Sequence, residues 1–393
     1  YAFIAPTYRQ AKDNVWKYVE RAAGVWQAHG ARINQSELSV RYPHGATIKL
    51  YGADNYDTLR GLRLCGAVLD EFADFDPRAW PTVVRPALAD RRGFATIIGT
   101  PRGHNSFYNI FQNSQGFTDD GQFDQRLKDE WFSLTLKASA LVPVNDKDPL
   151  ARDRDLLTSD ELESIKRGQS EEEFKQEFEC DFESAVIGAY FGKQMAALEK
   201  EGKITVVPYD PAHPVWTAWD IGGSRDATAI WFVQLIGRQI AVIDFYEATG
   251  ADSGPHARAV LGKPYQYAGH FIPHDAGPNR VGVDKSYQDF LSDHGLKNLT
   301  VLPVQMVEHG INATRLLLPR CVFDRQKCFT GIEALKLYRA EYDYRHAALK
   351  PTPVHDWTSH AADAFRYLAV ALDRHVVKSQ FHRKIAYPKL GKI

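Results

Sequence analysis

The stretch Val215–Tyr246, VWTAWDIGGSRDATAIWFVQLIGRQIAVIDFY, decides the fold of the C-terminal half. Its three apolar runs, residues 215–220, 227–235 and 239–246, are rich in the β-branched and aromatic side chains that favour strands. Short turns containing glycine separate the runs. The spacing therefore predicts three consecutive strands joined by tight turns.

Helices and strands alternate after these three strands. We expect a helix near 253–262, a strand at 269–275, a helix at 284–294, a strand at 299–304, and closing helices at about 331–345 and 359–374. A three-strand meander followed by this alternation is the order of the ribonuclease H-like fold, a mixed sheet flanked by helices. The predicted fold class of this half is therefore α/β, of the ribonuclease H-like type.

Three aspartates occupy informative positions in this order. Asp220 ends the first predicted strand, Asp275 ends the fourth, and Asp363 lies in the first turns of the last helix. Acids at strand ends and on a covering helix can converge on one side of a sheet. Hard divalent cations prefer oxygen ligands, and two such ions about 3.5–4 Å apart promote phosphodiester cleavage. The pattern predicts a catalytic site for two Mg²⁺ or Mn²⁺ ions on these three carboxylates.

Other polar residues near these aspartates leave alternatives open. Asp226 follows Asp220 across a glycine turn, so it could point back at the same site. His360 and Asp356 neighbour Asp363 and could orient a metal ligand or serve as a neutral base, while a capping or surface role is equally open. Each strand-end acid taken alone is also compatible with a turn former or a surface charge.

The N-terminal half has a different pattern. Residues 1–6 form an apolar run that reads as a strand already under way, and Thr7–Gln10 matches a capping box that opens a helix to about Ala23. A hairpin is expected around Pro43, and buried strands are expected at 66–69 and 94–100. Strands alternating with helices predict an α/β domain with a parallel sheet.

Asp70 and Glu71 follow the buried strand at 66–69 and match the Walker B pattern of ATPases. In that pattern the aspartate holds Mg²⁺ and the glutamate polarises the attacking water. Thr100 ends the next buried strand, where motor ATPases place a residue that senses the γ-phosphate. A strand-terminating turn is the simpler alternative for Thr100.

No G-x-x-x-x-G-K-[ST] loop occurs in the sequence, so the usual phosphate cradle is missing. Because Tyr1 reads as mid-domain, we expect that loop to lie upstream, and we expect this chain to hydrolyse ATP poorly by itself. ATP with Mg²⁺ is predicted as a cofactor of the full-length protein only.

Composition bounds the remaining possibilities. The chain has 393 residues, a formal net charge of −1 and four scattered cysteines, which gives neither an overall nucleic-acid signature nor a zinc motif. The sequence contains no long uninterrupted apolar run, so no membrane partner is expected. The predicted division is an ATPase domain at 1–184, a linker at 185–214, a nuclease domain at 215–377 and a basic tail at 378–393.

Several motifs together resemble the large terminase subunit of tailed bacteriophages. They are YAFIAPTYRQAK at 1–12, LRGLR at 59–63, VLDEFAD at 68–74, TPRG at 100–103, FKQEFECDF at 174–182, WDIG at 219–222 and HAADA at 360–364. The matches span nearly the whole chain and keep the order of the family, although each motif alone is only moderately specific.

The resemblance implies a role in packaging concatemeric double-stranded DNA into a procapsid in the host cell cytoplasm. It implies a ring, usually a pentamer, on the portal protein and a small terminase subunit as partner, with a monomer in isolation left open. Residue by residue, it implies Asp220, Asp275 and Asp363 as metal ligands and Asp226 as an auxiliary acid. In the motor it implies Asp70 and Glu71 as Walker B and Thr100 as the coupling residue.

Two other functional classes stay open at this point. A recombination nuclease or transposase can share the ribonuclease H-like fold, although it typically lacks a Walker B domain upstream. A non-catalytic protein that binds DNA or the portal could keep a vestigial site. Junction cleavage and metal titration separate these classes from a packaging nuclease.

Overall fold

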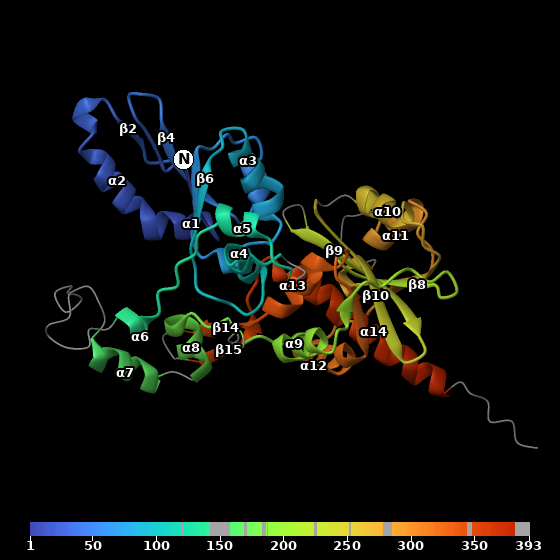
Figure 1. The fold of residues 1–393 in the computed structure, drawn as a ribbon. Coiled ribbons are helices and arrows are strands. Elements are labelled where there is room, and N and C mark those ends of the chain that lie inside the picture. Colours follow the sequence, from blue (N-terminus) through green and yellow to red (C-terminus); the bar gives the residue numbers. More distant parts are fainter. Residues whose placement is uncertain are drawn as a thin grey trace, which may run out of the picture. The chain divides into compact units, whose positions relative to one another are not determined.

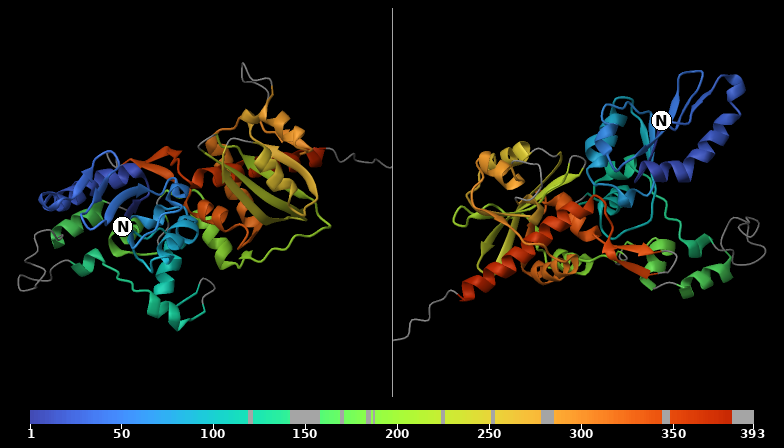
Figure 2. Two further views of the ribbon diagram at one scale, coloured as in Figure 1. Left: turned by 90° about the horizontal axis from the view of Figure 1, so that it is seen from above. Right: turned by 180° about the vertical axis from the view of Figure 1, so that it is seen from behind.

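The computed structural model describes the chain except residues 119–121, 142–157, 169–170, 183–185, 187, 224–225, 251–252, 278–284, 344–347 and 382–393. The chain divides into two compact units, Tyr1–Ile187 and Gly188–Ile393. Each unit is built around its own large sheet, as Figures 1 and 2 show. Most of the predicted basic tail at 378–393 lies outside the described residues.

The sheet of the first unit has the strand order β2-β3-β4-β1-β5-β6. Its four strands β4, β1, β5 and β6 run parallel, as predicted for this half. Strands β2 and β3 extend the sheet antiparallel, and the turn between β3 and β4 is the hairpin expected around Pro43. The strands are β1 (Ala2–Ala5), β2 (Arg32–Asn34), β3 (Ser39–Arg41), β4 (Thr47–Gly52), β5 (Gly66–Leu69) and β6 (Phe94–Ile97).

The first helix of this unit begins where the capping box predicts. The Thr7 hydroxyl accepts the Gln10 N–H at 3.2 Å, and the Gln10 side chain accepts the Thr7 N–H at 3.1 Å. The helices are α1 (Tyr8–Ala11), α2 (Lys17–Gly24), α3 (Arg85–Ala89), α4 (Ser106–Ser114), α5 (Gln125–Glu130), α6 (Ala138–Leu141), α7 (Ser159–Gly168) and α8 (Glu171–Glu179).

The sheet of the second unit has the order β12-β11-β8-β9-β10-β13-β7. Strands β8, β9 and β10 form the antiparallel meander, and β11 and β12 run parallel to β8 on its other side. This is the predicted ribonuclease H-like order, and the fold class is confirmed. The strands are β7 (Ile204–Thr205), β8 (Val215–Asp220), β9 (Ala227–Ile236), β10 (Gln239–Thr249), β11 (Tyr267–Ile272), β12 (Leu299–Val301) and β13 (Cys321–Asp324).

Helices cover both faces of this sheet because its central strands bury side chains on both sides. Ala218 and Trp231 pack with α9, α12, α13 and α14, whereas Trp219 and Phe232 pack with α10 and α11. The helices are α9 (Gly192–Lys200), α10 (Ser253–Leu261), α11 (Tyr287–Asp293), α12 (Val307–Leu317), α13 (Phe329–Leu337) and α14 (Thr358–Phe381).

Three details differ from the sequence expectations. The predicted linker at 185–214 contains α9 and β7, whose Met195 and Ile204 are buried in the core of the second unit. The helix expected at 331–345 ends at Leu337 and is followed by the hairpin β14 (Ala340–Asp343) and β15 (Ala348–Pro353). Helix α12 is an addition, because the sequence analysis places no element between 304 and 331.

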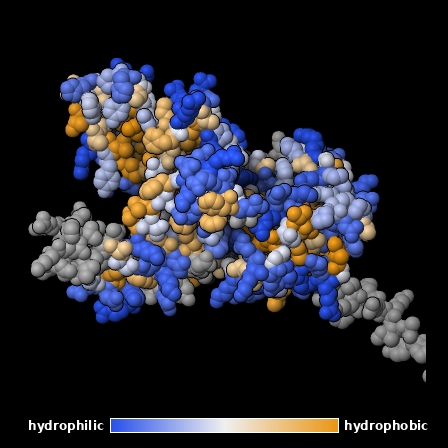
Figure 3. Space-filling model, in the orientation of Figure 1, coloured by the Kyte–Doolittle hydropathy of each residue, from blue (hydrophilic) through white to orange (hydrophobic). Residues whose placement is uncertain are grey.

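Hydrophilic side chains cover most of the face in Figure 3, with apolar side chains in small groups between them. Within the described part of the chain, none of the helices combines the length and the apolar character that crossing a bilayer requires.

Candidate functional sites

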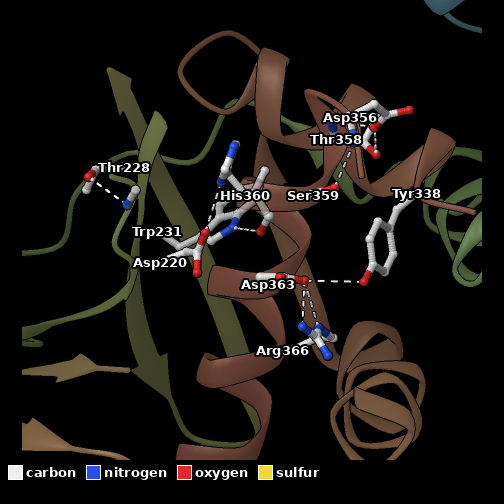
Figure 4. Close-up of polar contacts among 12 residues, drawn as sticks. Asp220, Thr228, Trp231, Tyr338, Asp356, Thr358, Ser359, His360, Asp363 and Arg366 are labelled. Carbon is white, nitrogen blue, oxygen red and sulfur yellow. Dashed lines mark hydrogen bonds and ion pairs between the residues drawn. The ribbon is translucent and has the colours of Figure 1, made fainter. Parts of the chain in front are cut away.

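In the second unit, the end of β8 faces the first turns of α14 (Figure 4). Asp220 is the last residue of β8, and Asp363 lies on α14. The Trp231 indole N–H donates to the Ala361 carbonyl at 2.8 Å and ties the start of α14 to β9. The structure thus brings together the strand-end acid and the helix acid that the sequence assigns to one site.

Asp220 is paired with a histidine from the same helix. The His360 Nδ1 lies 3.1 Å from the Asp220 Oδ2, and both side chains are mostly buried. Burial raises the pKa of Asp220 and the negative charge of Asp363 raises it further, while the hydrogen bond from His360 opposes both. Burial lowers the pKa of His360, but the hydrogen bond and charge of Asp220, together with nearby negative charges, raise the pKa overall.

Asp363 is paired with an arginine one helical turn further on. Its Oδ1 accepts hydrogen bonds from the Arg366 Nη2 at 2.6 Å and Nε at 3.0 Å, and from the Tyr338 hydroxyl at 3.3 Å. Figure 4 shows these three contacts converging on one carboxylate. Asp363 is therefore held firmly through one of its two oxygens.

Two further acids lie near His360, and one of them was not singled out from the sequence. Both Glu247 and Asp226 raise the pKa of His360 through their negative charge. Glu247 of β10 stands opposite Ala229 of β9, which stands opposite Asp220 of β8, so the three residues form one row across the sheet. Residues in such a row point to the same face, and the strand periodicity could have identified Glu247.

Asp275 stands further out than the other two predicted ligands. It is exposed, in a 3₁₀ turn (His274–Ala276) that follows β11, rather than at the end of the strand itself. Burial raises the pKa of Tyr367, and Asp220, Asp363 and Asp275 add to this rise in that order. Asp275 therefore acts on the same tyrosine as the inner pair.

The donor set fits a divalent cation only in part. Among the described residues, no three His, Cys, Asp or Glu side chains gather closely enough to hold an ion by themselves. Mg²⁺, however, commonly binds through one or two carboxylates and completes its shell with water and substrate phosphate oxygens. Asp220 at the end of β8 and Asp363 on α14 supply two carboxylates for that mode of binding.

The sequence interpretation missed the partners of Asp363. Arg366 and Tyr367 lie three and four residues after it, which places them on the same side of α14. This helical spacing could have identified both residues as neighbours of Asp363. Tyr338 gave no local signal, because it comes from the end of α13 and meets Asp363 only in the folded chain. Asp356 caps α14 instead, accepting from the Thr358 N–H at 2.9 Å.

In the first unit, Asp70 and Glu71 follow β5. The Asp70 N–H donates to the Ile4 carbonyl at 2.9 Å, which continues the pairing of β5 with β1. Glu71 has a left-handed backbone with φ of 52°, a conformation that costs energy for a residue with a side chain. Burial is the largest cause that raises the pKa of each carboxylate, and the charge of Asp74 adds to it for Glu71.

The loop after β6 is bonded to this acidic turn. The Thr100 backbone N–H donates to the Glu71 carboxylate. Arg102 forms an ion pair with Asp74 at 2.9 Å, and the buried Asn105 side chain donates to the Ala73 carbonyl at 3.1 Å. The structure thus brings Thr100 to Glu71. It also places Arg102 and Asn105 at this turn, and neither residue was assigned a role from the sequence.

Comparison with known proteins gives this pair of sites a context. No family model matches the chain. The chain is 27% identical over 330 residues to the large terminase subunit of Thermus virus P23-45, covering 77% of this chain and 63% of that protein. It is 22% identical over 381 residues to the large terminase subunit of Escherichia phage T5, covering 94% of this chain and 80% of that protein.

The chain is a homologue of phage large terminase subunits. It spans less than two thirds of the length of its Thermus relative.

Solved structures of terminases are also similar. The large terminase of a thermophilic bacteriophage is 15% identical, with a TM-score of 0.36 over 94% of this chain and 85% of that one. The ATPase domain of the Thermus phage P74-26 large terminase is 25% identical, with a TM-score of 0.35 over 46% of this chain and 75% of that one. The nuclease domain of the P22 large terminase is 19% identical, with a TM-score of 0.34 over 44% of this chain and 89% of that one.

Proposed function

We propose that the second unit is a divalent-metal-dependent endonuclease that cuts concatemeric double-stranded DNA, as part of a large terminase subunit. The observation that carries this proposal is that Asp220, at the end of β8, lies beside Asp363 on α14, the helix that packs against this strand of a ribonuclease H-like sheet (Figure 4). Carboxylate oxygens are the ligands that Mg²⁺ and Mn²⁺ prefer, and an ion bound to them would let a phosphodiester approach the two acids.

Asp220 and Asp363 would hold the metal, Asp275 would complete the triad from the rim, and Asp226 would serve as an auxiliary acid. Bound Mg²⁺ or Mn²⁺ would activate water and stabilise the leaving oxygen. The chain itself supplies orientation. His360 holds the Asp220 carboxylate, Arg366 holds Asp363, and the tie from Trp231 keeps α14 against the sheet.

For the first unit we propose the nucleotide-hydrolysing part of a packaging motor in the full-length protein. Asp70 would bind Mg²⁺ with ATP, Glu71 would polarise water, and Thr100 would couple hydrolysis to movement. The hydrogen bond from the Thr100 N–H to Glu71 supports this pairing. The proposal extends to the division into an ATPase domain and a nuclease domain. It also extends to a small terminase subunit, a portal-bound pentamer and the host cytoplasm as the setting.

Cleavage of supercoiled plasmid in Mg²⁺ or Mn²⁺, without ATP, tests the nuclease. The wild-type chain should nick and linearise the plasmid, and Asp220→Ala should not. Asp293→Ala is the matched control, because this exposed aspartate pairs with Lys285 on the surface. Preferential cutting of branched junctions would favour a recombination nuclease. Absence of Asp220-dependent cleavage and of Asp220-dependent metal binding would favour a non-catalytic binding protein.

A further inference from the structure

Arg366 places a buried positive charge against a proposed metal ligand. The residue is 8% exposed, and two of its N–H groups converge on the Asp363 Oδ1. With the Tyr338 hydroxyl, this oxygen accepts three hydrogen bonds. In the described part of the chain, the Oδ2 of Asp363 accepts none, so one oxygen is saturated and the other is left for a further partner.

The neighbouring helix α12 contacts the Arg366 side chain and holds it in place. The Arg366 Nη1 donates to the Val307 carbonyl at 3.3 Å. Gly310 lies against the arginine stem, and a Cβ added at Gly310 would stand 3.2 Å from the Arg366 Cβ and 3.4 Å from its Cδ. A buried guanidinium is tolerated only when it is paired and hydrogen-bonded. These contacts therefore fix the position of the guanidinium group and orient it toward Asp363.

We propose that Arg366 is a positioning residue that limits Asp363 to coordination through one oxygen and lowers the affinity of this site for divalent cations. The inference rests on the proposed nuclease function. Since like charges repel strongly where burial reduces solvent screening, the guanidinium competes with an ion bound to the same carboxylate. Cation binding would then depend on the added oxygens and negative charge of a substrate phosphate, which keeps the site weakly loaded until DNA arrives.

Mn²⁺ titration of the full chain by calorimetry, without DNA, tests this inference. Arg366→Gln removes the charge and keeps a hydrogen-bond donor, whereas Arg366→Lys keeps the charge and loses the two-point contact. We expect Arg366→Gln to bind Mn²⁺ at least about tenfold more tightly than wild type and Arg366→Lys to stay within about threefold. A purely structural ion pair predicts the opposite sign, because loss of positioning would weaken binding. Unchanged or weaker binding by folded Arg366→Gln would overturn the inference.

A second variant covers the case in which Arg366→Gln does not fold. Gly310→Ala keeps every charged and polar group, and its Cβ would crowd the Arg366 side chain. It should tighten Mn²⁺ binding by about threefold, and unchanged or weaker binding would count against the inference. Asp220→Asn separates the two levels of the proposal. Wild-type binding that does not depend on Asp220 would overturn the nuclease as well. Asp220-dependent binding that fails to tighten in either variant would overturn only the role of Arg366.

Discussion

Both units place acids at the end of a buried strand, but they restrain those acids differently. In the first unit the backbone restrains them, since Glu71 has a left-handed conformation and accepts the Thr100 N–H. In the second unit side chains restrain them, since Asp220 and Asp363 pair with His360 and Arg366 of one helix. The first site should therefore be more sensitive to backbone changes, and the second to single side-chain replacements.

Among these predictions, the largest effect is expected when the side chain of Asp363 is replaced. Asp363→Asn keeps the shape but removes the charge that would bind the cation, so plasmid cleavage should fall by more than about 100-fold. Initial rates of nicking at saturating Mn²⁺ measure this loss. Cleavage at the wild-type rate would show that the assignment of Asp363 as a ligand is wrong.

His360 should have the next largest effect if side chains restrain the second site. Replacing a group that orients a metal ligand typically costs about 10–100-fold, and His360→Gln should lower Mn²⁺ affinity or cleavage by that amount. His213→Gln is the matched control, because His213 makes the same kind of contact with Asp210 at 3.0 Å on the surface. Equal Mn²⁺ affinity and equal cleavage by the two variants would show that His360 does not orient a metal ligand.

For the first unit, where the backbone restrains the acids, we expect a smaller effect, and it is a gain in stability. Glu71→Gly relieves the left-handed strain and should raise the unfolding free energy of the first unit by about 1 kcal/mol. Arg92→Gly is the control, since Arg92 is exposed and has φ of 48° away from the site. Thermal denaturation compares the two. Stabilisation by Arg92→Gly but not by Glu71→Gly would mean that Glu71 contributes contacts that outweigh its strain.

The smallest effect is a pH dependence at Glu71. Burial raises the pKa of this carboxyl in the folded chain, so its ionisation destabilises the fold as pH rises through the folded pKa. Glu71→Gln should therefore stabilise the first unit near neutral pH. The gain should vanish below the ordinary glutamate pKa of about 4.3. Melting temperatures at a series of pH values measure the difference, and a gain that is independent of pH would contradict this cause.

The two sites also show what the sequence could predict. Asp70 and Glu71 are adjacent, so their pairing needs only a local pattern. Asp220 and Asp363 can be assigned to one site from the order of elements, because the meander and the following helices determine which strand end faces the last helix.

The contacts of Tyr338 and Arg102 could not be predicted from the sequence, because they depend on how helices and loops pack in the folded chain. The buried α9 was also missed, because glycines and prolines around it favoured a linker.

The position of Mn²⁺ in crystals of the chain, located by anomalous scattering, tests most directly whether Asp220 and Asp363 hold the metal. We expect a peak between Asp220 and the Oδ2 of Asp363, with Arg366 still bonded to the Oδ1. A peak elsewhere in the unit, or none at a Mn²⁺ concentration that saturates the DNA-free chain in calorimetry, would contradict the assignment of this acid pair as the catalytic centre.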